Sequence, residues 1–229
     1  MKQSLLPKPI FTFLKNIKKH NNRVWFNANK SDYLKQYESV VHFADILIAK
    51  MNRHDKIETP SGKKAVFRIY RDVRFSKDKS PYKTHFGLHL SRATKLLRGG
   101  YYLHMEPGNC FMGGGFWDPS PEDLKHIREQ IASDPKPLRN ILKSKSFKSN
   151  FKELQGDKLV FAPKGFDKNH PAVDLLKYKQ FLISTSIPDS VLISSKGIEE
   201  VVKSFRAMRP FFDYMSDILT TNTNGEPLF

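Results

Sequence analysis

Apolar side chains recur at every second position through much of the segment 67–115, whereas the segments around it repeat their apolar residues at helical spacing. This change constrains the fold most, because side chains alternate between two faces in a strand and follow the helical turn in a helix. Strands are predicted at 67–75, at 82–90, at 101–106 and from Cys110 into the run Gly113–Gly115. Short turns join them, which favours antiparallel pairing.

Helices are predicted before and after this sheet. Apolar side chains at helical spacing indicate helices at about 8–19 and 31–53. Ser120 followed by a proline marks another helix start. A long helix is predicted at about 196–219, and Pro210 should kink it or divide it in two.

The fold class that follows is α+β. It has a mostly antiparallel sheet at about 65–115, with a short later strand or two, packed with N-terminal and C-terminal helices. No repeat, low-complexity segment or linker interrupts the chain. We therefore expect a single domain over residues 1–229, with a globular core at about 8–215 and a loose tail at 220–229.

The positive charge of the chain is concentrated in one segment. The formal net charge is +16, and residues 61–98 alone carry 11 basic and 2 acidic side chains. Such a cluster concentrates anions. Three interpretations follow: a basic pocket for a phosphorylated or carboxylated small molecule, a surface for the backbone of RNA or DNA, or a structural protein whose acids neutralise the arginines in an ionic core.

Most candidate ligand-binding residues lie between Phe67 and Gly87. Arginine presents a planar fork to carboxylate and phosphate groups, and aromatic rings could form the walls of a pocket. Arg71 breaks the apolar face of the first predicted strand, so its charge needs a partner. A compact pocket requires the arginines to converge with His104. The candidates are Arg68, Tyr70, Arg71, Arg74, Lys77, Lys83, His85, Tyr102 and Trp117.

Tyr102, His104 and Glu106 alternate along one predicted strand and therefore share a face. Residues two apart in a strand lie roughly 6.6 Å apart, so His104 and Glu106 are candidates for proton transfer on one small substrate. Pairing with the strand at 82–90 would bring His85 or His89 opposite His104. A metal site and an ordinary ion pair between Glu106 and an arginine are the alternatives. We assign no metal and no cofactor, and leave open whether the protein is an enzyme.

The remaining motifs exclude several classes of site. Five residues separate the glycine run 113–115 from the helix start at Pro121, and their order is not that of a phosphate-binding loop, so the glycines indicate close backbone packing or a bulge. The single Cys110 excludes an internal disulfide, which fits a reducing compartment. The N-terminal residues lack a leader's continuous apolar core, and no run of 18 apolar residues exists. We expect a soluble cytoplasmic protein with no membrane partner.

Several long strings resemble a known family. These are FRIYRDVRFSKDKSPYKTHFG, GYYLHMEPG and GGGFWDPSPEDLKHIR, with NNRVWFNANKSDY before them and GDKLVFAPKGFDKNHPAVDLLKYKQF after them. They are similar to an uncharacterised bacterial family, the domain-of-unknown-function family DUF2461, over roughly Phe11 to Phe212. Met105 stands where the family's pattern has leucine. The resemblance implies one domain and carries over no catalytic residue.

Overall fold

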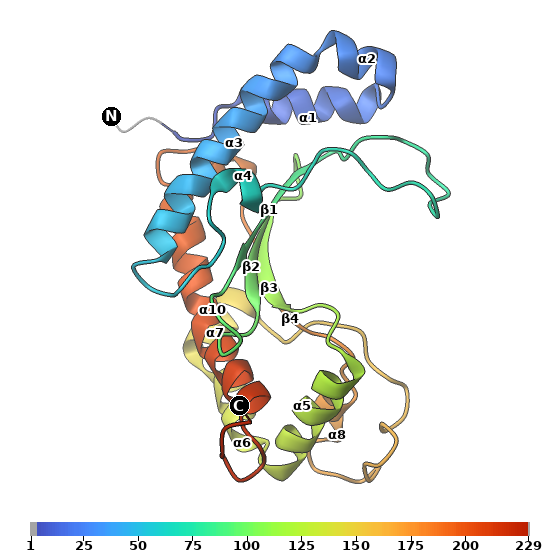
Figure 1. Cartoon of the computed structure of the whole chain (residues 1–229), viewed down its shortest axis with the longest axis vertical. Coiled ribbons are helices and arrows are strands. Elements are labelled where there is room, and N and C mark those ends of the chain that lie inside the picture. Colours follow the sequence, from blue (N-terminus) through green and yellow to red (C-terminus); the bar gives the residue numbers. More distant parts are fainter. Residues whose placement is uncertain (1–3, 229) are drawn as a thin grey trace. The chain divides into compact units, whose positions relative to one another are not determined.

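The computed structural model describes residues 4–228 and has the α+β fold expected from the sequence (Figure 1). Its sheet has four antiparallel strands in the order β1-β2-β3-β4. Ten helices accompany the sheet in the part of the chain described. The strands are β1 Phe86–Ser91, β2 Gly100–Met105, β3 Phe111–Phe116 and β4 Phe181–Ser186.

The chain divides into two compact units. Unit 1 comprises the residues up to Ser91, together with Tyr102–Met112 and Ser186–Lys203. Unit 2 comprises Arg92–Tyr101, Gly113–Thr185 and the residues from Ser204 onward. Strands β2, β3 and β4 therefore each have residues in both units.

Unit 1 is built on helices that pack around β1. The predicted N-terminal helices are present, and Asn22 caps the short helix between them by accepting a hydrogen bond from the Trp25 backbone N–H at 2.9 Å. The side chains of Phe86, Leu88 and Leu90 are buried in β1, against which α3 packs. The helices are α1 Pro9–Lys19, α2 Arg23–Ala28, α3 Lys30–Met51, α4 Gly62–Ala65 and α9 Asp189–Leu192.

Unit 2 holds the remaining helices and most of the last one. The side chain of Ser120 caps α5 by accepting from the Asp123 backbone N–H at 3.0 Å, as the sequence predicts. Tyr101 packs against Phe205 and Phe212, with ring centroids 4.9 and 5.1 Å away. The helices are α5 Pro121–Ser133, α6 Lys136–Lys143, α7 Lys145–Phe151, α8 Val173–Leu176 and α10 Gly197–Thr220, the first residues of which lie in unit 1.

Pro210 does not divide the last helix. Helix α10 is continuous from Gly197 to Thr220 with the proline inside it. Met208, Phe211 and Phe212 flank the proline and are fully buried. Burial of these large side chains offsets the missing backbone N–H of the proline, so of the two expected outcomes, a kink or a division, the division is wrong. No helix in the described part of the chain combines the length and apolar character needed to cross a membrane.

The first predicted strand, 67–75, is also wrong. Residues 67–83 form an extended loop, here called the basic arm, that runs out from the end of α4 and returns to β1 (Figure 1). Its two halves make the isolated bridge Tyr70 to Tyr82, and Val66 beside the arm bridges to Leu88, but no regular ladder of strand pairing forms over 67–83. Ile69 is buried but Phe75 is 96% exposed, so the alternating apolar residues do not share one buried face and no regular strand forms.

The glycine run before α5 has the structural role that the sequence indicates. A Cβ at Gly114 would lie 2.4 Å from the Gly100 carbonyl oxygen. Gly115 has φ +129°, and a Cβ there would lie 2.1 Å from the Phe181 carbonyl oxygen. Both positions therefore require glycine for close backbone packing within unit 2.

Candidate functional site

A cleft of about 530 Å³ opens in unit 1 between the end of α1, the basic arm and the residues just before β1. Its walls carry both basic and acidic side chains, and one histidine lies among them. The lining residues are Lys18, Asn21, Arg71, Asp72, Asp78, Ser80, Tyr82, Lys83, Thr84 and His85.

Asn21 fixes the returning half of the basic arm beside the cleft. Its Nδ2 donates to the Tyr82 carbonyl oxygen at 2.9 Å, and its Oδ1 accepts from the Tyr82 backbone N–H at 3.0 Å. The Tyr82 ring stacks on Phe26 of α2 with 4.0 Å between centroids. The sequence indicates only that Asn21 ends a helix, and this long-range backbone contact has no local signal.

Behind His85 lies a second imidazole. The ring centroids of His85 and His104 are 4.2 Å apart. The ring of Phe111 also stacks on that of His104, with 4.7 Å between centroids. His104 is 8% exposed, whereas His85 lines the cleft. The pairing of β1 with β2 thus brings His85 to His104, one of the two arrangements that the sequence allows.

Tyr102, His104 and Glu106 form one hydrogen-bonded chain. The Tyr102 hydroxyl lies 2.8 Å from Nδ1 of His104, and Nε2 of His104 lies 3.4 Å from Oε2 of Glu106. A carboxylate only accepts hydrogen bonds, so in neutral His104 the proton is on Nε2 and points at Glu106. Nδ1 therefore accepts from the Tyr102 hydroxyl. This alternating set is the one that the two-residue period predicts on a single strand face.

Glu106 is held from three further directions. Thr84 Oγ1 and Asn109 Nδ2 each donate to its carboxylate at 3.1 Å, and Lys18 Nζ lies 3.8 Å away. Burial alone would raise the pKa of Glu106, but these donors, His104 and the lysine charge lower it below its usual value. Glu106 is therefore an anion at neutral pH, and no arginine among residues 4–228 pairs with it.

Both imidazoles of the pair are neutral at neutral pH. Burial first, and then the charges of His104 and Lys83, lower the pKa of His85 to about 4, while Glu106 acts in the opposite direction. Burial also lowers the pKa of His104, against its contact with Glu106. Burial and the nearby Glu106 charge raise the pKa of Tyr102 to about 12. Together with His85, the hydrogen-bonded side chains of Tyr102, His104 and Glu106 thus present a phenol, two uncharged imidazoles and a carboxylate.

The arginines of the basic arm are engaged by its own acids. Arg71 forms an ion pair with Asp78 and donates to the Ser80 carbonyl oxygen at 3.1 Å. Arg74 pairs with Asp72 at 2.7 Å. Lys83 instead donates to the carbonyl oxygen of Arg68 at 2.8 Å, a neutral acceptor.

The structure brings together only some of the predicted ligand-binding residues. Arg71, Lys83 and His85 line the cleft, and Tyr102 reaches it only through His104. Trp117 lies in unit 2 and is 70% exposed. The predicted convergence of the arginines with His104 is therefore wrong, since the following residues are exposed on the basic arm and do not line the cleft: Arg68, Tyr70, Arg74 and Lys77.

Lys18, Asn21 and Thr84 are site residues that sequence reasoning missed. They come from the end of α1 and from the turn before β1. Burial and the neighbouring Asp189 raise the pKa of Cys110 to about 12, so this buried thiol is protonated at neutral pH. Within residues 4–228, no three His, Cys, Asp or Glu side chains are placed to hold a metal ion.

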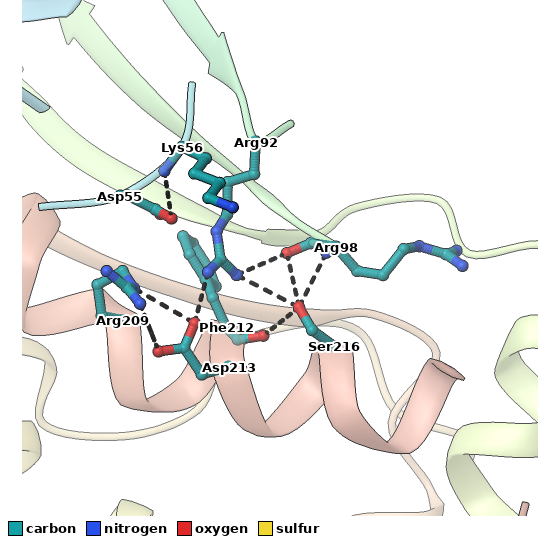
Figure 2. Close-up of polar contacts among 8 residues, drawn as sticks. All are labelled: Asp55, Lys56, Arg92, Arg98, Arg209, Phe212, Asp213 and Ser216. Atoms are coloured by element: carbon teal, nitrogen blue, oxygen red, sulfur yellow. Dashed lines mark hydrogen bonds and ion pairs between the residues drawn. The ribbon is translucent and has the colours of Figure 1, made fainter. Parts of the chain in front are cut away.

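A second polar cluster lies in unit 2 (Figure 2). The side chain of Arg92 is 0% exposed and forms an ion pair with Asp213. Arg209, one helical turn before Asp213 on α10, reaches the same carboxylate at 3.0 Å. Arg92 also donates to the Arg98 carbonyl oxygen at 3.1 Å and to Ser216 Oγ at 3.3 Å. The pairing of arginines with acids that the sequence offers as an alternative occurs in the basic arm, at Arg71 and Arg74, whereas the buried ion pair of Arg92 was not predicted.

The chain matches the family model described as conserved hypothetical protein (DUF2461) over residues 9–214. It therefore belongs to this family, as its long sequence strings indicate. The match runs through both units, and a single domain stays a prediction. No curated protein and no solved structure matches the chain.

Proposed function

We propose that this member of the DUF2461 family binds a small phosphorylated or carboxylated molecule in the cleft of unit 1, and that His85 exchanges a proton with it. One observation carries the proposal: cationic side chains and a neutral imidazole line the same cleft, and a hydrogen-bonded carboxylate lies behind that imidazole. The reaction class that this arrangement fits is general acid–base chemistry on an anionic ligand.

The charges around the cleft support an anion. Asp78 forms an ion pair with Arg71, and Asp72 forms one with Arg74, so neither acid is left to repel an anion. Lys83 donates to a neutral carbonyl oxygen, and Lys18 is mostly exposed, with its Nζ 3.8 Å from the Glu106 carboxylate. An ammonium group bonded to a neutral or distant acceptor keeps donor capacity for a phosphate or carboxylate oxygen.

The histidine pair supports proton exchange with that ligand. Burial, above all, and the charge of Lys83 lower the pKa of His85 and hold it neutral at neutral pH in the free protein. An anion in the cleft would favour the imidazolium form, so binding should draw a proton from solvent onto His85. His104 keeps His85 in place through ring contact, and Glu106 supplies a fixed negative charge behind both rings.

The proposal is tested by titrating the full chain with inorganic phosphate and with succinate, followed by calorimetry and by NMR of the histidine rings. We expect saturable binding at one site, with shifts at His85. Lys83→Met should weaken binding by about tenfold, equivalent to about 1.4 kcal/mol. The matched control is Lys148→Met, because Lys148 is an exposed lysine on α7 that does not line the cleft.

The two variants separate a site from a general charge effect. Equal weakening by Lys83→Met and Lys148→Met would mean that only the net charge of the chain attracts the anion. Absence of saturable binding of both probes, in a folded protein, would also remove the proposal.

A further inference from the structure

The outer surface of the basic arm carries features that the cleft does not use. Phe75 lies at its far end and is 96% exposed, the highest exposure of any large apolar side chain described. The Arg74 guanidinium lies 5.9 Å from the centroid of the Phe75 ring. This ring and the guanidinium beside it neither pack in the core nor line the cleft.

Two more aromatic rings lie partly open along the same arm. Phe67 and Tyr70 are each about half exposed, and Lys83 Nζ lies 5.5 Å from the centroid of the Phe67 ring. Tyr70 is anchored at its edges by Tyr82 and Phe26, with centroids 5.5 and 6.1 Å away. Three rings with exposed area therefore occur within nine residues of chain.

The positive charge on this surface is not balanced by the arm itself. Residues 63–83 contain eight basic and two acidic side chains. Both acids, Asp72 and Asp78, are already paired with arginines of the arm. The exposed cations that remain on the arm and on the adjacent α4 are Lys63, Lys64, Arg68, Lys77 and Lys79.

Internal hydrogen bonds give the end of the arm a defined shape. Lys79 Nζ donates to the carbonyl oxygens of Val73 and Arg74 at 3.0 and 3.4 Å. The Ser80 backbone N–H donates to Asp78 Oδ1 at 2.9 Å. A surface that is already folded loses less conformational entropy when a partner binds.

We propose that this outer surface binds single-stranded nucleic acid. Sequence-tolerant binding of single strands combines cations that follow the phosphates with aromatic rings on which bases stack. Phe75, Tyr70 and Phe67 supply the rings, and the exposed lysines and Arg68 supply the charge. A base-paired duplex would keep its bases stacked and leave these rings unused. The proposal is independent of the ligand proposed for the cleft.

Fluorescence anisotropy with labelled oligo(dT) and oligo(U), added to the full chain at several salt concentrations, tests this proposal. We expect binding that weakens steeply as salt rises and that favours single strands over a duplex of equal length. Phe75→Ala should weaken binding at least about fivefold, the lower range for loss of one stacked base. Because Phe75 is exposed, this variant should fold, which circular dichroism checks.

Matched variants distinguish this surface from the cleft. Lys77→Met should weaken oligonucleotide binding and lower its salt dependence, whereas Lys148→Met on α7 should change neither. His85→Asn should leave oligonucleotide binding unchanged even if it alters phosphate binding. Three outcomes would overturn the proposal: no binding at low salt, equal affinity for the folded Phe75→Ala variant, or binding to anionic phosphatidylserine vesicles without binding to the oligonucleotides.

Discussion

The imidazole rings of His85 and His104 lie 4.2 Å apart, one at the wall of the cleft and the other buried behind it. Burial lowers the pKa of both, so neither carries a positive charge at neutral pH. Two imidazolium rings at this distance would repel each other. The pair therefore accepts a proton only in acid, or when an anion lies beside it.

The first prediction is that acid destabilises the fold through these rings. The pKa of His85 falls from 6.5 to about 4 on folding, so the unfolded chain binds the proton more tightly. The contribution of neutral His85 to the free energy of unfolding is fully present above about pH 6.5 and is lost as the pH falls toward 4. One such proton contributes a slope of at most about 1.4 kcal/mol per pH unit. Urea unfolding at a series of pH values measures it.

Single substitutions test whether His85 causes this pH dependence of stability. His85→Asn should reduce the pH dependence between pH 6.5 and 4. His42→Asn is the matched control, because His42 is exposed on α3 and should leave the slope unchanged. If His85→Asn unfolds with the same pH dependence as the parent chain, His85 does not carry the effect.

The second prediction concerns the hydrogen bond between Tyr102 and His104. Tyr102→Phe leaves Nδ1 of His104 without its donor inside a buried cluster. We expect a loss of about 1 kcal/mol in the free energy of unfolding. The nitrogen chemical shifts of His104 should also change, since the preference for the Nε2–H tautomer loses one support.

Tyr37→Phe provides the control for the loss of a hydroxyl group. Among the residues described, the Tyr37 hydroxyl makes no hydrogen bond, so its removal should change stability little. A Tyr102→Phe protein with unaltered stability and unaltered His104 shifts would contradict the hydrogen bond.

The third prediction links anion binding to pH. Sulfate is a suitable probe because its charge is constant across the range where His85 titrates. Its affinity for the cleft should rise as the pH falls from 7 toward 5, because the bound anion stabilises protonated His85. Calorimetry in buffers of different ionisation enthalpy should detect proton uptake. His85→Asn should remove both effects, and pH-independent sulfate binding to the parent chain would argue against proton exchange.

The two-residue alternation of side chains along a strand predicts the part of the site that lies on β2. Tyr102, His104 and Glu106 form a chain because alternate side chains share a face. Pairing of neighbouring strands predicts a histidine opposite His104. Lys18 and Asn21 could not be found this way, because they reach the cleft from the end of α1 and depend on how that helix packs.

The basic arm shows the limit of periodicity. Its alternation resembles that of the true strands, but a strand also needs a partner and a core to face. Phe75 has neither, and Arg71 and Arg74 are satisfied by acids within the arm. Local charge pairing therefore replaced the pocket of arginines expected from composition. The buried ion pair lies at Arg92, which the sequence does not distinguish from the other ten basic residues of 61–98.

The fourth prediction concerns that buried ion pair in unit 2. Asp213 accepts hydrogen bonds from Arg92 and Arg209 (Figure 2). Asp213→Asn removes the negative charge beside a guanidinium with a fully buried side chain. Leaving a buried charge with weaker compensation is costly, so we expect a loss of about 3 kcal/mol in the free energy of unfolding. Urea unfolding of the parent and variant chains measures the difference.

A matched pair in the same unit tests whether burial is the cause. Arg139 and Asp174 also form an ion pair, at 2.7 Å, but both side chains are substantially exposed. Solvent screens such a pair, so Asp174→Asn should cost less than about 1 kcal/mol. If the two asparagine variants lose equal stability, the buried environment of Arg92 adds nothing to the value of its ion pair. If Asp213→Asn costs much more, the unit depends on this cluster in the way that its burial predicts.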